Sequence, residues 1–164
     1  IGHNRRLPDG KGGVGWGVHV GGHYDTHTPV LLVRRRASPR TLAILSHGCH
    51  PTTSGNVEKW WTDYPGPLRQ TGARGLGGDA AVVFAMGCGA DTKTTGLDPA
   101  TGQPVFLSSP AAARRKGREL GRAVLKFIRG GALSPVAARL ACGIGAGRLS
   151  FAARTPRAKL ERLA

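Results

Sequence analysis

The sequence predicts a mixed α/β fold in which β-sheet layers are flanked by helices. Short runs of β-branched and aliphatic residues have the length of strands, and glycine or proline turns separate them. One later stretch, residues 110–129, repeats apolar residues at the three- and four-residue spacing of an amphipathic helix. Strand-like and helix-like segments thus alternate loosely along the 164 residues, and no internal repeat is visible.

The first part of the chain, residues 1–29, is predicted to be a glycine-rich loop region. Residues 10–22 read GKGGVGWGVHVGG, and a regular element there would lose much backbone entropy. A core of strands and helices is predicted for residues 30–153. It opens with a hairpin, because the strand-like runs Val30–Arg35 and Thr41–Ser46 flank a Ser-Pro turn.

The middle of the chain is predicted to hold one poor helix and one buried strand. The helix covers residues Tyr64–Arg74, in a stretch that carries several glycines and prolines. Ala80–Met86 is almost continuously apolar over the length of a strand, which favours burial on both faces. This strand leads into glycine and a polar loop, Gly87–Asp91.

The clearest predicted element is a helix from Pro110 to Arg129. Ser109 is a good N-cap, Pro110 suits the first helical position, and Gly130 ends the helix. Its arginines and Glu119 mostly occupy the face opposite the apolar stripe, which predicts a solvated charged surface. The stripe consists of Ala113, Gly117, Leu120, Val124, Phe127 and Ile128.

The end of the chain is predicted to hold one more strand and a short helix. A strand-like run, Arg139–Ala153, is interrupted by three glycines. Thr155 and Pro156 then open a C-terminal helix, and residues 154–164 form the last predicted segment.

The composition limits the classes of function. The formal net charge is +15, with 24 Lys and Arg against 9 Asp and Glu, but the basic residues are scattered in small clusters. Aromatic residues make up only 5% of the chain, which is few for the stacking platforms of single-strand binders. Nucleic acid is therefore not an expected partner. The longest apolar run, Ala80–Met86, is too short to span a bilayer.

Histidines gather in one part of the sequence, and this density suggests a metal site. His19, His23, His27, His47 and His50 lie within 32 residues, together with Asp25. Imidazole and carboxylate are the usual ligands of a catalytic zinc. His50 is the best candidate, because it lies where a strand ends, directly before a proline. His47 lies three residues earlier, would point to the opposite face, and is the weaker candidate.

The segment from Ala43 to Thr53, AILSHGCHPTT, resembles the neutral and alkaline, non-lysosomal ceramidases, where such a strand carries a zinc-binding histidine. Further segments resemble the same family in the same order along the chain. They are Asn4–Arg6, Asp25–Val33, Thr62–Gly66, Val83–Asp91 and Phe151–Arg157. The resemblance implies that residues 1–164 are a partial ceramidase-like catalytic domain.

The resemblance implies roles for a few residues. His50 matches the zinc-binding histidine, and Arg5 matches an arginine that lines the substrate site. Gly87 stands where the family has its serine nucleophile, and Cys88, one place later, is a weak substitute that reads more readily as a buried structural cysteine. The other zinc ligands of the family lie outside this sequence. The implied substrate is a ceramide-like lipid amide, and the implied cofactor is Zn²⁺.

Two other functions fit parts of the sequence. His23-Tyr24-Asp25 is similar to a motif of zinc aminopeptidases, where the histidine and the aspartate bind metal. The second acidic residue of that family does not follow closely here. The net charge alone would fit a basic, non-enzymatic module for nucleic acid or an anionic surface, and a peripheral membrane contact stays open.

The chain is expected to be a fragment of a larger catalytic domain. It begins with Ile1, and its only methionine, Met86, lies deep in an apolar run. Its three cysteines are far apart and form no CxxC pair, so the redox compartment stays open. The resemblance implies a secreted or periplasmic protein.

Overall fold

The computed structural model describes residues 1–34, 36–58, 60–77, 79–131, 133–137 and 141–148. The chain divides into two compact units, Ile1–Leu133 and Ser134–Ala164. In the second unit the described residues, 134–137 and 141–148, have no regular secondary structure, contrary to the strand predicted from residue 139 onward. The predicted C-terminal helix, 154–164, lies outside the described residues. All elements below belong to the first unit.

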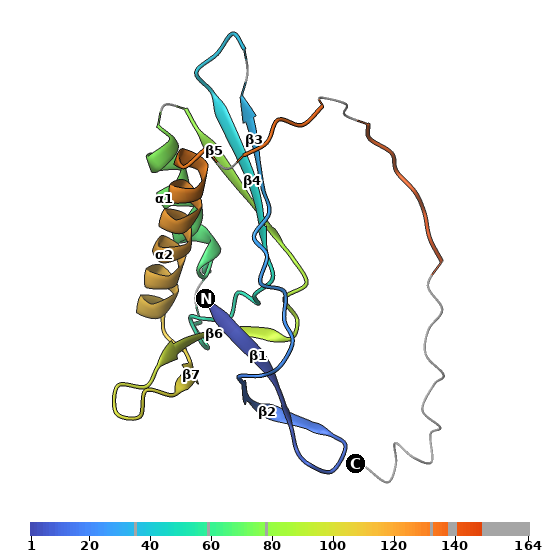
Figure 1. The fold of residues 1–164 in the computed structure, drawn as a ribbon, viewed down its shortest axis with the longest axis vertical. Helices are drawn as coiled ribbons and strands as arrows, with labels where there is room; N and C mark the ends of the chain where they lie inside the picture. The colour runs from blue at the N-terminus through green and yellow to red at the C-terminus, as the bar shows by residue number, and fades with distance from the viewer. Residues whose placement is uncertain (35, 59, 78, 132, 138–140, 149–164) are drawn as a thin grey trace. The chain divides into compact units, whose positions relative to one another are not determined.

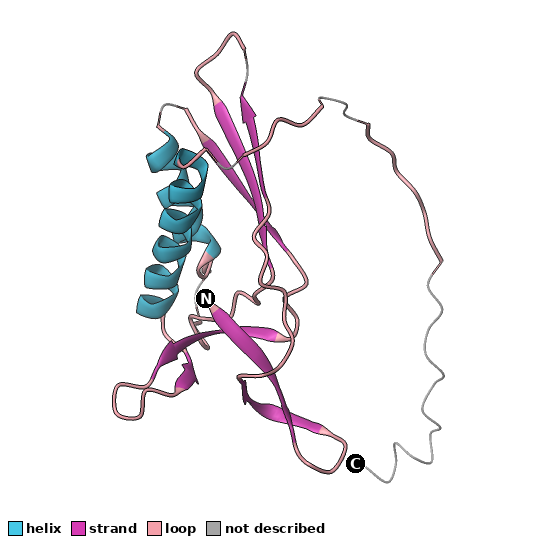
Figure 2. Cartoon of the chain, viewed as in Figure 1, coloured by secondary structure: helices cyan, strands magenta, loops and turns pink. Residues whose placement is uncertain are grey.

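The first unit is a mixed α/β domain, as predicted, with two sheets and two helices (Figures 1 and 2). One sheet has four strands in the order β2-β1-β6-β7 and the other has three in the order β3-β4-β5. The strands are β1 Gly2–Pro8, β2 Val14–His19, β3 Val30–Arg34, β4 Thr41–His47, β5 Ala81–Met86, β6 Thr92–Leu97 and β7 Pro104–Phe106. The helices are α1 Pro65–Leu76 and α2 Pro110–Arg129. None of the described helices is long and apolar enough to cross a membrane.

The predicted hairpin is confirmed, since β3 and β4 pair antiparallel from Val30↔Leu45 to Arg34↔Thr41. β5 then pairs with β4 in parallel, with His47 opposite Met86 at the end of the pair. The two helices pack against one face of this sheet. The core between them contains Ala43, Leu45, Leu68, Val82, Leu120, Val124 and Ile128.

The prediction that residues 80–86 are buried on both faces is wrong. β5 is an edge strand, and only Val82 on it is buried, whereas Val83 and Met86 are exposed. The helices cover a single face of the three-stranded sheet, so the alternate residues of β5 have nothing to pack against in the described part of the chain. A continuous apolar run does not by itself distinguish a central strand from an edge strand.

The prediction of a loop at residues 10–22 is also wrong, because β2 lies within it. β1 and β2 form a hairpin within residues 1–29, with Arg6 opposite Trp16. Gly10 and Gly12 have positive φ angles in the turn, where glycine is favoured. The Trp16 ring packs 5.4 Å from that of Phe106, centroid to centroid, so a distant contact supports a glycine-rich strand.

Helix α2 matches its predicted bounds, and Ser109 Oγ accepts a hydrogen bond from the Ala112 N–H at 3.2 Å. Its buried stripe is rotated slightly from the prediction. Phe127 is 46% exposed, while Gly121 and Leu125 are buried. The rotation follows from α1, which packs along α2 as well as against the sheet.

Candidate functional site

The ends of β4 and β5 bring two candidate segments side by side. Because these strands are parallel, their carboxyl ends meet at one edge of the sheet, where α/β proteins often bind ligands. The Gly87 N–H donates to the His47 carbonyl oxygen at 3.1 Å, and the His50 N–H donates to the Thr92 oxygen at 3.1 Å. The histidine segment 47–50 therefore lies against the loop 87–91.

This close approach depends on glycine. A Cβ on Gly89 would lie 2.8 Å from the Cys49 nitrogen, so no side chain fits at this position without a backbone shift. A Cβ on Gly87 would lie 3.1 Å from Ser46 Oγ, which is tight but adjustable. Position 87, which the resemblance compares with a serine nucleophile, thus offers little space beside β4.

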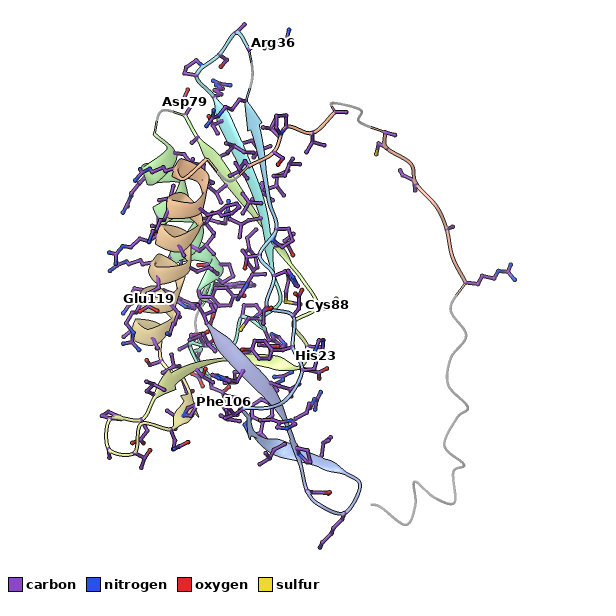
Figure 3. The ribbon with its side chains drawn as sticks, viewed as in Figure 1. His23, Arg36, Asp79, Cys88, Phe106 and Glu119 are labelled. Atoms are coloured by element: carbon purple, nitrogen blue, oxygen red, sulfur yellow. The ribbon has the colours of Figure 1, made fainter. Side chains whose placement is uncertain are left out.

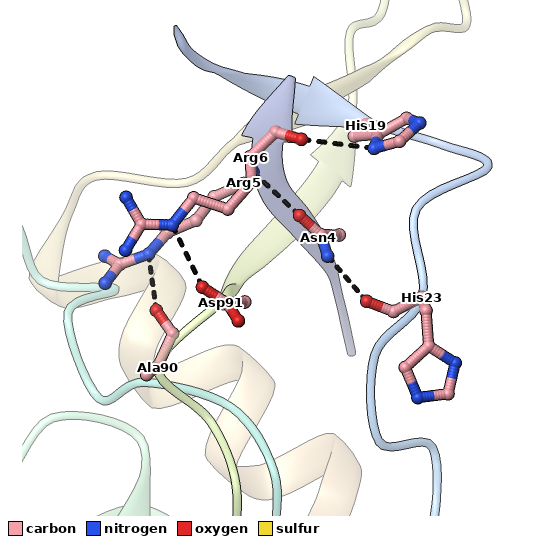
Figure 4. A network of polar contacts seen from close by, with 7 residues as sticks. All are labelled: Asn4, Arg5, Arg6, His19, His23, Ala90 and Asp91. Atoms are coloured by element: carbon pink, nitrogen blue, oxygen red, sulfur yellow. Dashed lines mark hydrogen bonds and ion pairs between the residues drawn. The ribbon is translucent and has the colours of Figure 1, made fainter. Parts of the chain in front are cut away.

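Arg5 joins the same region from the other sheet (Figure 4). Its backbone N–H donates to the Asp91 carbonyl at 2.7 Å, and its Nε donates to the Ala90 carbonyl at 2.8 Å. Arg6 Nε forms an ion pair with Asp91 Oδ1 at 2.9 Å. The Arg5 guanidinium also lies 4.9 Å from the Trp16 ring centroid. These contacts fix strand β1 to the loop that follows β5.

His50 supplies one candidate metal ligand. Its Nδ1 atom is buried and has no hydrogen-bond partner in the described structure, which is unusual for a polar atom and compatible with a ligand or ion. Among the described residues, however, no group of three His, Cys, Asp or Glu side chains could hold a metal. The described residues thus offer one candidate zinc ligand, His50, and do not supply the remaining ligands.

His47 is buried, and it lines a polar cavity of about 220 Å³ with Asp25 and Thr92. Its Nδ1 lies 2.9 Å from Thr28 Oγ1, while its Nε2 is buried without a partner. Burial is the main reason that the His47 pKa falls to about 4, and the nearby Asp25 carboxylate opposes that shift. His47 is therefore a neutral imidazole at physiological pH.

The other histidines do not gather around His50. His19 Nδ1 lies 3.1 Å from the Arg6 carbonyl, and His27 Nδ1 lies 3.2 Å from Asp25 Oδ1. His23 is exposed, and its carbonyl accepts a bond from Asn4 Nδ2. The described geometry adds no support to a metal site built on His23 and Asp25.

The burial of the cysteine side chains differs from the expectation for Cys88. Cys88 is exposed at the end of β5, so its reading as a buried structural cysteine is wrong (Figure 3). Cys88 follows the last paired residue of β5, Met86, and its neighbours Ala90 and Asp91 are exposed as well. Cys49 is the buried cysteine, and burial raises the pKa of its thiol to about 11.

The sequence assigned no role to Asp63 and Tyr64. Their side chains form hydrogen bonds to Ser54 and to the Cys49 carbonyl oxygen, close to His47 and His50 in the chain. Tyr64 is fully buried, and its hydroxyl donates to the Cys49 carbonyl at 2.5 Å. Burial raises the pKa of Asp63, but hydrogen bonds from Ser54 Oγ and two backbone N–H groups outweigh this effect, and the net pKa is lowered. Both residues lie in Thr62–Gly66, one of the segments that resemble the ceramidases, and this was the sequence feature that could have singled them out.

We expect His47 to make stability depend on pH. Its pKa is about 4 in the folded state against 6.5 for the free side chain, so the unfolded state takes up the proton first. The contribution of His47 to the free energy of unfolding is up to about 3 kcal/mol. It is complete above pH 6.5 and is lost as the pH falls to 4. Urea denaturation over this range should show a steeper loss for the wild type than for His47→Gln. Exposed His27→Gln is the control, and parallel wild-type and His47→Gln curves would contradict the assignment.

A comparison of this chain with protein-family models, with curated proteins and with solved structures finds no match.

Proposed function

We propose that this chain forms part of a zinc-dependent amide hydrolase of the neutral/alkaline ceramidase type, which cleaves the amide bond of a ceramide-like lipid. One observation carries the proposal. Arg5, which the resemblance assigns to the substrate, donates hydrogen bonds to the loop 87–91, which it assigns to the nucleophile. His50, which it assigns to the metal, donates to Thr92 directly after that loop. Contacts across 85 residues of sequence are not implied by the motifs themselves.

The roles of the residues follow from their positions. His50 would bind the metal through its imidazole, with the other ligands outside the described residues. When bound, a zinc ion polarises a carbonyl and lowers the pKa of water. The Arg5 guanidinium is held by Ala90 and Trp16 beside the loop, where it can orient a polar substrate group. Gly87 has no side chain to attack a carbonyl, and the exposed Cys88 thiol is the weak alternative.

A test of the proposal measures zinc and hydrolysis together on the full-length protein. We expect metal analysis to find bound zinc in the wild type and a fluorescent ceramide analogue to be cleaved. His50→Ala should lose both, since one ligand of a small set is removed. His27→Ala, which changes an exposed histidine, should keep both. Equal zinc content in wild type and His50→Ala would refute the ligand assignment.

A second pair of variants addresses the nucleophile. Cys88→Ser and Cys88→Ala should differ in hydrolysis only if this side chain attacks the substrate. If both variants keep the wild-type rate, Cys88 has no catalytic part and the reaction proceeds without a side-chain nucleophile at 87–88.

A further inference from the structure

The exposed side of helix α2 is strongly basic. The helix carries seven Lys and Arg residues and a single acidic one, Glu119 (Figure 3). Most of the basic residues follow each other at three- and four-residue spacing and therefore share one side of the helix. We call this side the basic face; it consists of Arg114, Arg115, Arg118, Arg122, Lys126 and Arg129, all of them exposed.

The charge of the basic face is poorly neutralised. Glu119 is shared between Arg115, at 3.8 Å, and the neighbouring Lys116, at 3.0 Å. Within the described part of the chain, no carboxylate lies within ion-pair distance of Arg118 or Arg122. Four of the arginines line a shallow depression of about 390 Å³. Arg129, at the far end of the face, donates to the Gly75 carbonyl oxygen at 2.8 Å. The central Arg118 and Arg122 have no such partner among the described residues, which favours a surface role for them.

Two exposed tryptophans adjoin the first turn of this face. Trp60 is completely exposed, at 103% of its reference area, and Trp61 is 41% exposed. The Arg114 guanidinium lies 5.6 Å from the Trp61 ring centroid, so the tandem pair sits beside the basic face. Exposed apolar patches that are rimmed by polar residues can mark protein or membrane interaction sites.

We propose that the basic face, with Trp60 and Trp61, is a docking surface for a membrane that carries anionic lipids. Basic side chains are attracted to the negative surface potential, and tryptophan prefers the bilayer interface. Single-stranded nucleic acid is the less fitting partner. Its binding sites place aromatic rings along a basic groove, whereas here the two rings adjoin one end of an exposed helix face. The docking surface does not depend on the proposed hydrolytic activity.

Vesicle co-sedimentation of the full-length protein tests this surface. We expect binding to phosphatidylcholine vesicles that contain phosphatidylserine, weakening with salt, and little binding to pure phosphatidylcholine. Arg118→Gln/Arg122→Gln should weaken partitioning about fivefold for each charge removed. Lys11→Gln/Arg34→Gln removes the same charge elsewhere on the surface and should have a smaller effect. Equal effects of the two double variants would overturn the proposal, because net charge alone would then explain binding.

Fluorescence tests the tryptophans separately. The part of the emission that is lost in Trp60→Ser/Trp61→Ser comes from these two residues, and in the wild type it should shift to the blue when anionic vesicles are added. Trp60→Ser/Trp61→Ser should weaken partitioning by tenfold or more, and circular dichroism should show that it still folds, because both residues are exposed. Absence of a shift would overturn the proposal. So would tight binding of a single-stranded oligonucleotide by a protein that ignores the vesicles.

Discussion

Replacing Tyr64 with alanine should destabilise the domain by about 3–5 kcal/mol, the range for removing a buried aromatic side chain. Tyr64 is fully buried at the start of α1. Its ring meets those of Phe84 and His47 edge-on, at centroid distances of 5.7 and 6.3 Å. Removing it would leave a cavity between the helices and the three-stranded sheet, where close packing allows little collapse.

The hydroxyl group of Tyr64 makes a separate contribution that Tyr64→Phe isolates. That variant keeps the ring but leaves the Cys49 carbonyl without its donor, at a cost of about 1–3 kcal/mol. Tyr24→Ala, which alters the only other tyrosine at a partly exposed position, should cost much less. Urea denaturation gives all three values. Equal losses for Tyr64→Ala and Tyr24→Ala would show that Tyr64 does not organise the core.

The elements predicted correctly are those that local sequence determines. α2 has its N-cap, its first-turn proline and its terminal glycine within a few residues of its ends, so its bounds follow from the chain alone. The β3–β4 hairpin is also local, because its two strands adjoin one turn. The fold class follows once these elements are recognised.

Some of the elements that were missed depend on distant partners. β1 pairs with β6 across about ninety residues, from Gly2↔Thr94 to Asn4↔Thr92. β6 is polar in sequence, yet Thr92–Thr95 are buried. Its neighbour β7 follows it directly in the chain, but its other neighbour is the distant β1. Neither alternation nor composition signals such a strand.

The candidate site was predictable only in part for the same reason. The resemblance singled out His50, Arg5 and the loop 87–91 as separate motifs. Their proximity results from the parallel pairing of β4 with β5 and from the contact between β1 and Asp91. The polar cavity beside His47 and the support from Tyr64 require side-chain packing that no sequence pattern specifies.

Gly117 lies where α1 and α2 pack most closely, and any side chain there should be destabilising. A Cβ on Gly117 would overlap the Tyr64 carbonyl oxygen and lie 3.0 Å from the Leu68 nitrogen, both backbone atoms that cannot move aside. Helix propensity alone would make Gly117→Ala stabilising by about 1 kcal/mol. We expect the opposite sign, a net loss of about 1–3 kcal/mol from overpacking, and a larger loss for Gly117→Val.

The sign of the stability change in Gly117→Ala shows whether close helix packing or helix propensity dominates at this position. Ala123→Val, on the exposed side of α2, introduces the same β-branched side chain without a contact to α1 and should cost only a few tenths of a kcal/mol. Thermal and urea denaturation of the three variants decide the matter. A Gly117→Ala protein more stable than wild type would mean that the helices do not approach this closely. Because α1 begins directly after Tyr64, separating the helices should also loosen the hydrogen bond to Cys49 and, with it, the segment that carries His47 and His50.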